Sequence, residues 1–430
     1  MRKALLSMLV LAIWLGLSSC GQTASGQEMK SDKPRDSSPT VDEADVTAIV
    51  EGNSAFAFDL YQVLRQTDGN LFYSPYSISE ALAMTYAGAR GETETDMANA
   101  LNFNLSQELL HPAFNSLDLQ LRQRGQGAKG KDEKGFRLHV VNAIWGQKDY
   151  KFLSQFLDVL AENYGAGLRI LDFINETEPS RLTINKWVSD QTEGKIRDLV
   201  PQGAINQLTR LVLTNAVYFN AAWQYPFEKG ATADGLFHLL SGGDITVPMM
   251  KQTKTFRYTE GTDYQAVELP YDGQELSMVI LLPKDGQFST FEKKLDAALV
   301  KAIIGNLETA EVFLTMPKFE YESSFSLKEA LSTLGMQVAF TADADFSGMD
   351  GKRDLFIQAV LHKAFVSIDE AGTEAAAATA VIMGRTAMPS QSVEVRIDRP
   401  FIFLIRDIAT GSIIFVGRVL NPSVVNPQQK

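Results

Sequence analysis

The stretch IDEAGTEAAAATAVIMGRTAMPSQ, residues 368–391, suits neither a buried element nor an ordinary surface loop. Its four consecutive alanines favour a helix, but Gly372 precedes them and no apolar stripe at helical spacing could bury such a helix. As a strand, the stretch places small side chains on one face, and residues 373–380 contain no proline or bulky side chain that would block a hydrogen-bond ladder. The composition therefore fits a flexible linker or a frayed helix, and it would also allow an extended strand.

The chain around this stretch has the composition of a globular protein. Of its 430 residues, 45% are hydrophobic and 21% are charged, which is enough to build a sizeable core. The net charge of -12 disfavours binding to nucleic acid or to an anionic membrane surface. We expect no nucleic-acid partner.

Hydrophobic periodicity predicts helices early in the chain and strands later. Residues 49–66, 77–91 and 93–101 have helical spacing. Runs of β-branched and aromatic residues predict strands over 136–147, 209–223, 277–286, 311–323 and 399–423, the last of them a hairpin turning at Thr410-Gly411. This order predicts an α+β fold with large antiparallel or mixed sheets.

The first residues resemble a bacterial lipoprotein signal peptide. Arg2 and Lys3 precede a short apolar run, and residues 1–19 end in Leu-Ser-Ser before Cys20, as at a lipobox. Cys20 is the only cysteine in the chain, so no intramolecular disulfide can form. We expect export, acylation of Cys20, and attachment at the cell envelope or cell surface through the lipid alone, with release to the extracellular space as the alternative.

Residues 20–45 have the composition of a solvated tether. They lack aromatic residues and are rich in Ser, Asp, Lys and Gly, so they cannot bury enough apolar area to fold alone. We expect a disordered tether over 20–45 and one folded domain over 46–425.

Motifs for catalysis or metal binding are absent from the sequence. The four histidines, His111, His139, His238 and His362, have no paired-ligand spacing, and no GxSxG occurs. A GxGxxG match at 125–130 follows no apolar strand, and acidic residues interrupt its lysines, so it predicts a solvated loop. We expect no metal, no cofactor and no enzyme activity, and only a weak case for a polyanion site.

Several long motifs closely resemble the serpin family. The first is NLFYSPYSIS at 70–79, continued by ALAMTYAGARGET, and the second spans 184–227. Further matches are MPKFEYESSFSLKEALSTLGM at 316–336, HKAFVSIDEAGTEAAAAT at 362–379 and the strands from 399. The resemblance covers residues 47–424 in order. It implies the serpin fold, with three β-sheets, about nine helices and an exposed reactive-centre loop at about 370–392.

The resemblance also implies a suicide-substrate inhibitor of serine proteases. The protease would be held as a covalent 1:1 acyl-enzyme complex while the cleaved loop enters the main sheet as a strand. The residues that match the family's hinge, where insertion begins, are Glu370, Gly372, Thr373, Glu374, Ala375, Ala376, Ala377, Ala378 and Thr379.

Two further groups match control points of the family. Ser74, Ser77, Asn215 and His362 correspond to a polar cluster beneath the sheet, where strands must part; an ordinary buried hydrogen-bond network is the plainer interpretation. Trp223 corresponds to a tryptophan at the top of the sheet, and Glu370 with Lys318 to an ion pair beside it.

The position of the cleaved bond has two solutions. The commonest family spacing from Glu370 places the specificity residue at Thr386, followed by Ala387, and this would suit an elastase-like protease. A shorter spacing selects Arg385 and the bond Arg385-Thr386, which would suit the buried carboxylate of a trypsin-like pocket. We favour the trypsin-like target.

Rival functions remain at this stage. They are inhibition of an elastase-like or a papain-like cysteine protease, and a non-inhibitory serpin acting as carrier or chaperone. A surface adhesin would not need the hinge. The small residues of the hinge favour an inhibitor, which we expect to act as a monomer.

Overall fold

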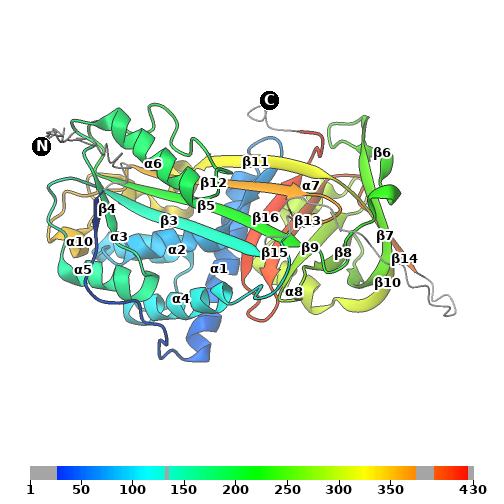
Figure 1. The fold of residues 1–430 in the computed structure, drawn as a ribbon, viewed down its shortest axis with the longest axis horizontal. Coiled ribbons are helices and arrows are strands. Elements are labelled where there is room, and N and C mark those ends of the chain that lie inside the picture. Colours follow the sequence, from blue (N-terminus) through cyan, green and yellow to red (C-terminus); the bar gives the residue numbers. More distant parts are fainter. Residues whose placement is uncertain (1–26, 131–134, 374–391, 425–430) are drawn as a thin grey trace, which may run out of the picture.

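A computed structural model describes residues 27–130, 135–373 and 392–424 (Figure 1). The α-helices in these residues are α1 (Glu43–Leu64), α2 (Pro75–Tyr86), α3 (Gly91–Leu101), α4 (Gln107–Arg122), α5 (Ser154–Val159), α6 (Thr177–Gln191), α7 (Phe288–Lys293), α8 (Ala297–Gly305), α9 (Lys328–Leu331) and α10 (Ser347–Asp350). Short π-helical and 3-10 segments are η1 (Leu160–Tyr164), η2 (Lys229–Ala231), η3 (Ser332–Met336) and η4 (Val338–Phe340).

One mixed sheet contains the residues of greatest functional interest. Its order is β1-β4-β3-β5-β13-β12-β11. The strands are β1 (Gln27–Met29), β4 (Leu168–Leu171), β3 (Arg137–Gln147), β5 (Leu211–Ala222), β13 (Gly372–Thr373), β12 (Ala359–Ile368) and β11 (Phe319–Ser326). β5 and β12 also pair directly and in parallel over Ala359–Ala364 of β12. We call this seven-stranded sheet the main sheet.

The other strands form a second sheet. Its order is β14-β10-β7-β8-β9-β15-β16-β2, with β6 on β7. Their bounds are β2 (Leu71–Tyr73), β6 (Ala233–His238), β7 (Asp244–Glu260), β8 (Tyr264–Pro270), β9 (Leu276–Pro283), β10 (Glu308–Pro317), β14 (Val393–Arg396), β15 (Phe401–Asp407) and β16 (Ile413–Val419). The long β7 pairs with β6, β10 and β8, so two expected sheets are joined into one.

Alternation along β5 divides the core into two layers. Leu213 and Val217 belong to the large core, whereas Val212 and Ala216 pack with Ile184 of α6 on the opposite face. Successive strand residues point to opposite faces, so one strand supplies both layers. Figure 1 shows α6 over one face of the main sheet and α2 behind the other.

The start of α2 lies directly beneath the main sheet. Ser74 is the N-cap residue, and its hydroxyl accepts a hydrogen bond from the N–H of Ser77 at 3.2 Å. Pro75 occupies the first helical turn, where its missing N–H costs nothing. Every residue of α2 is buried, which fixes the position of its polar side chains against the strands above.

Residues 27–42 do not form the solvated tether that their composition predicts. β1 pairs antiparallel with β4, and Lys30 donates to the carbonyl of Gly165 at 3.0 Å. Arg35 reaches α4, where it donates to Asn115 at 2.8 Å and to buried Asp118 at 2.6 Å. The prediction considered only apolar burial, whereas charged side chains and one sheet edge hold this segment against the body.

The expected fold class is confirmed, with differences in detail. The described residues contain ten α-helices, where the resemblance implied about nine. The predicted hairpin is β15 and β16, joined through Thr410-Gly411. In the described part of the chain, no helix combines the length and the apolar character needed to cross a membrane.

Candidate functional site

Of the hinge residues, Gly372 and Thr373 form β13, which lies in the main sheet between β5 and β12. Gly372 lies opposite Ala222 and Thr373 opposite Ala221, and Thr373 also lies opposite Ile368 of β12. Thr373 is only 2% exposed. The end of the loop that was expected to be exposed is thus already part of the sheet in this structure.

At residue 372 the chain passes so close to the backbone of β5 that only glycine fits. Its φ is +148°, a conformation that residues with a side chain rarely adopt. A Cβ atom at this position would lie 2.2 Å from the carbonyl oxygen of Ala221 and 2.7 Å from Cα of Ala222. The glycine therefore permits the chain to enter against β5.

Trp223 and Tyr271 hold the entering chain. Their rings stack at a centroid distance of 4.7 Å with planes 8° apart. The indole Nε1 of Trp223 donates to the carbonyl of Asp369 at 3.0 Å, and its backbone N–H donates to the carbonyl of Ala371 at 2.9 Å. The Tyr271 hydroxyl shares a 3.1 Å hydrogen bond with that of Thr373. The sequence analysis did not single out Tyr271.

Glu370 and Lys318 form the expected ion pair. Lys318 Nζ lies 2.8 Å from Glu370 Oε2, and the hydroxyl of Thr232 donates to the other carboxylate oxygen at 2.8 Å. Burial opposes ionisation of Glu370, but these two hydrogen bonds, a backbone hydrogen bond and the positive charge of Lys318 together lower its pKa. The Glu370 side chain is 6% exposed, so the pair is more protected than a surface salt bridge.

A row of polar side chains crosses the underside of the main sheet. Asn142 of β3, Asn215 of β5 and His362 of β12 are register partners on adjacent strands. Asn215 accepts a hydrogen bond from His362 Nδ1 and donates to Asn142 and to the Ser77 hydroxyl. His362 Nε2 accepts from the N–H of Ser74 at 3.2 Å. We call these five residues the polar row.

Burial keeps the histidine of this row neutral. His362 is fully buried, and burial lowers its pKa to about 3. With Nδ1 donating and Nε2 accepting, both ring nitrogens have partners. Separation of β5 from β12 would break the bond between Asn215 and His362, so the polar row joins these two strands.

Glu80 extends the polar row on α2. Asn142 Nδ2 donates to Glu80 Oε2 at 2.8 Å and to the carbonyl of Ser77 at 3.2 Å. Burial, reinforced by nearby Asp118, raises the pKa of Glu80 to about 8, while Arg122 and Arg35 oppose this. The sequence analysis missed Asn142 and Glu80, although an asparagine within the apolar run of β3 is a visible signal.

The family described as Serpin (serine protease inhibitor) matches residues 51–422. The chain belongs to the serpin family. Leukocyte elastase inhibitor of Homo sapiens is 41% identical to this serpin over 383 residues, covering 86% of this chain and 98% of its own. An uncharacterized serpin-like protein of Thermococcus kodakarensis is 38% identical over 435 residues, with 98% and 99% covered.

A solved structure gives the same assignment for the fold. The thermophilic serpin tengpin in its native state superposes with a TM-score of 0.81 at 29% identity, and the match covers 92% of this chain and 100% of that one. Both the family and the fold expected from the motifs are therefore confirmed.

Other candidate residues of this serpin lie outside the described structure. They are Cys20, the hinge residues Glu374, Ala375, Ala376, Ala377, Ala378 and Thr379, and the cleavage candidates Arg385, Thr386 and Ala387. Among the described residues, no three His, Cys, Asp or Glu side chains gather as a metal site requires.

Replacement of Glu80 by Gln should stabilise the serpin at neutral and alkaline pH. The folded-state pKa of about 8 lies above the unfolded value near 4.5. As pH rises between these values, the unfolded state loses its proton first, so the stability of the wild type falls through this window and then levels off. Glu80→Gln removes this loss, on the order of a few kcal/mol at pH 8, and should unfold like the wild type near pH 4.

Denaturant unfolding of the intact protein at pH 4, 6 and 8 measures the effect. Glu51→Gln is the matched control, because the Glu51 side chain is 59% exposed. Equal pH slopes for Glu80→Gln and Glu51→Gln would show that the Glu80 carboxyl is not held neutral beneath the sheet.

Proposed function

We propose that this serpin is a protease inhibitor, not an enzyme, and that it acts on serine proteases of trypsin-like specificity. Its family and its relationship to leukocyte elastase inhibitor support protease inhibition in general. The observation that carries the mechanism is the position of Thr373 between β5 and β12. This position supports insertion, because a continuation of the same strand would lie between β5 and β12.

The chemistry is supplied by the target protease. Its serine Oγ attacks the carbonyl carbon of Arg385, the Arg385-Thr386 peptide bond breaks, and the new amine of Thr386 leaves with a proton. The acyl group of Arg385 remains esterified to the protease. Residues after Thr373 then enter the main sheet as a strand and carry the tethered protease with them.

Insertion halts the reaction before the ester is hydrolysed. The twelve residues from 374 to 385, at roughly 3.4 Å each, would move the protease by some 40 Å along the sheet. The protease would then be pressed against the opposite end of the inhibitor, which would displace the catalytic groups of the protease. Small displacements of these groups lower the rate of ester hydrolysis by orders of magnitude. The covalent 1:1 complex would then persist with a monomeric inhibitor.

Incubation with trypsin tests this proposal. We expect a complex that survives a denaturing gel and a released peptide whose N-terminus is Thr386, identified by mass spectrometry. Arg385→Ala is the matched variant and should lose the complex with trypsin. Complete cleavage without any covalent complex would contradict inhibition and would favour a carrier or chaperone role.

The released N-terminus also decides between target classes. A peptide beginning at Ala387, formed faster with elastase than with trypsin, would support the elastase-like alternative. A stable complex with papain would support a cysteine protease target. Cleavage outside residues 381–390 would contradict both positions of the reactive bond.

The molecule is also proposed to be a bacterial lipoprotein held at the cell envelope or surface through Cys20. Figure 1 shows β1 beside β4 at one end of the molecule and β14 at the other end. β1 begins seven residues after Cys20 in the sequence and pairs with β4 at the first of these ends. Anchoring there leaves the end that carries β14 facing away from the lipid surface.

Loss of Cys20 should release the protein from membranes. We expect the wild type to incorporate labelled fatty acid and to sediment with membranes, and Cys20→Ala to do neither. Ser19→Ala, which keeps a small residue before the cysteine, is the control and should behave as the wild type. A wild type that takes up no fatty acid and stays soluble would contradict the anchor.

A further inference from the structure

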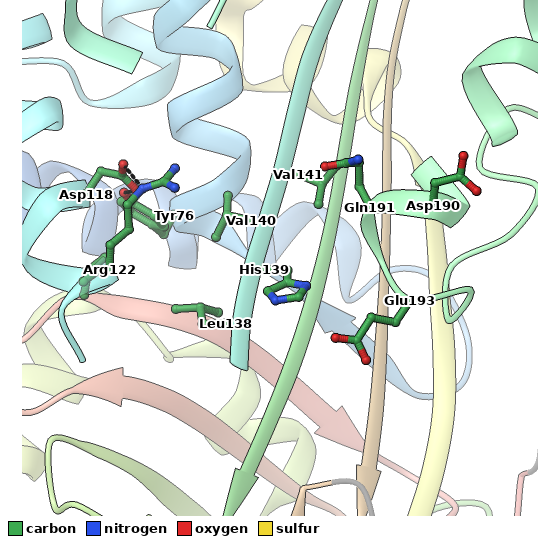
Figure 2. Close-up of a pocket in the computed structure, with 11 residues that line it drawn as sticks. Tyr76, Asp118, Arg122, Leu138, His139, Val140, Val141, Asp190, Gln191 and Glu193 are labelled. Atoms are coloured by element: carbon green, nitrogen blue, oxygen red, sulfur yellow. Dashed lines mark hydrogen bonds and ion pairs between the residues drawn. The ribbon is translucent and has the colours of Figure 1, made fainter. Parts of the chain in front are cut away.

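A cleft of about 340 Å³ follows the first part of β3 between α4 and the end of α6. Four consecutive strand residues line it, Leu138 to Val141, over a length of roughly 13 Å. Figure 2 shows Leu138 and Val140 on the α4 side of the strand, and His139 and Val141 on the α6 side. A cleft lined by both faces of one strand runs along the edge of that strand.

This edge of β3 carries backbone groups that no strand pairs. The N–H of Gln147 donates to Arg210 beyond the end of β5, and the N–H of Lys148 donates to Leu171 of β4. Because successive residues direct their backbone groups to opposite sides, the even-numbered residues of β3 face away from β5. β4 pairs with β3 only from Ile144 onward.

Leu138 and Val140 therefore have unoccupied edge positions. Within the described part of the chain, no hydrogen bond reaches the N–H or C=O groups that they direct to this side. Both residues are only partly buried. The two together present two N–H donors and two C=O acceptors in the spacing of a sheet edge.

The walls of the cleft differ in polarity. On the α4 side, Tyr76 and Leu121 are apolar and buried, and the carboxylate of Asp118 is neutralised by Arg122 at 2.5 Å and Arg35 at 2.6 Å. On the α6 side, the cleft is lined by His139, Asp190, Gln191 and Glu193. A strand in the cleft would meet apolar side chains and one compensated ion pair on the α4 face, and mostly polar side chains beside Val141 on the α6 face.

The same side of the main sheet already binds an extended chain. β1 adds to β4 in antiparallel orientation, with Gln27 opposite Ile170 and Met29 opposite Leu168. β4 begins opposite Ile144 of β3, so the unpaired edge of β3 starts where the β3–β4 pairing ends. The geometry of strand addition is thus present one strand away.

We propose that this cleft is a docking site for an extended segment of another protein, which adds to the edge of β3 as a strand. Its side chains facing α4 are apolar, and those facing α6 are polar. Backbone hydrogen bonds to Leu138 and Val140 supply the attachment, and the alternation of side chains supplies the selectivity. The site joins α4, β3 and α6, so its occupant contacts the side of the sheet away from β12.

The probe is the capped hexapeptide acetyl-Thr-Val-Thr-Val-Thr-Lys-amide, added to the full-length protein. We expect saturable binding and slowed amide hydrogen exchange confined to residues 138–142. An analogue with every backbone N–H methylated cannot form the ladder and should bind at least tenfold more weakly. Equal binding of the analogue would overturn strand addition.

Two variants separate the cleft from general effects on folding. Val140→Pro removes an N–H that faces the edge and leaves the bonds to β5 intact, as proline on an edge allows. Leu138→Glu places a charge on the apolar side. Each should weaken peptide binding at least tenfold while the thermal midpoint and the reaction with trypsin stay unchanged.

The location of slowed exchange decides among the other outcomes. Slowed exchange in β5 and β12 instead of β3 would mean that the peptide enters the main sheet, which overturns the proposal. Self-association through the β3 edge, seen as dimers that the peptide does not disperse, would assign the cleft to a second copy and would also overturn it. Since the readout is binding, failure here leaves the inhibitory proposal standing.

Discussion

Thr373→Arg should convert the protein from an inhibitor of trypsin into a substrate. Thr373 is 2% exposed, lies between β5 and β12, and shares a hydrogen bond with the Tyr271 hydroxyl. A guanidinium at this position would be buried without a partner, at a cost of several kcal/mol. Since about 1.4 kcal/mol on the insertion barrier changes the outcome tenfold, hydrolysis of the ester should overtake insertion.

The measurement is the number of inhibitor molecules consumed for each trypsin molecule inactivated. We expect at least a tenfold rise for Thr373→Arg, with cleavage at the same bond because the residues that contact the protease are unchanged. Thr373→Ser keeps the hydroxyl that meets Tyr271 and should inhibit as the wild type does. If Thr373→Arg inhibits with the stoichiometry of the wild type, insertion at this position is not part of the mechanism.

Cleavage of the wild type at the reactive bond should raise its apparent Tm by roughly 20 °C or more. In the intact structure, β5 and β12 pair directly over Ala359–Ala364 of β12. A strand inserted between them replaces one hydrogen-bonded ladder by two, and each added backbone hydrogen bond contributes about 1 kcal/mol. The gain spread over the inserted residues accounts for a shift of this size.

Thermal unfolding of intact and cleaved protein, each purified, checks this expectation. Cleaved Thr373→Arg is the matched control, because it has the same broken bond but an impeded first position. It should gain much less than the cleaved wild type. A wild type whose Tm is unchanged by cleavage would show that the loop does not enter the sheet.

The fold could be predicted from the sequence because its motifs are long and local. The segment at 70–79 contains the N-cap and the first turn of α2, and the runs at 136–147 and 209–223 contain β3 and β5. These patterns depend on neighbours in the chain. The segment 27–42 could not be predicted in this way, because its partners, such as Asp118, lie far away in the sequence.

The candidate site was predictable only in part for the same reason. The resemblance supplied Asn215 and His362, but Asn142 joins them through the register of β3 on β5, which no local pattern specifies. Tyr271 follows β8, and only the folded chain brings its hydroxyl to Thr373. The residues that the sequence analysis missed are therefore those whose role depends on strand pairing and contacts between distant parts of the chain.

The position of β13 bears on the first step of the proposed loop insertion. Adding a strand to a sheet has a nucleation step and a propagation step. Nucleation is slow, because the first contact restricts the whole loop and forms few hydrogen bonds, whereas each later contact forms quickly. Gly372 and Thr373 have already made that first contact in the uncut molecule. Under the proposed mechanism, the nucleus would therefore exist before the protease arrives. The rate of insertion would then depend on propagation, which requires β5 and β12 and the polar row that joins them to separate.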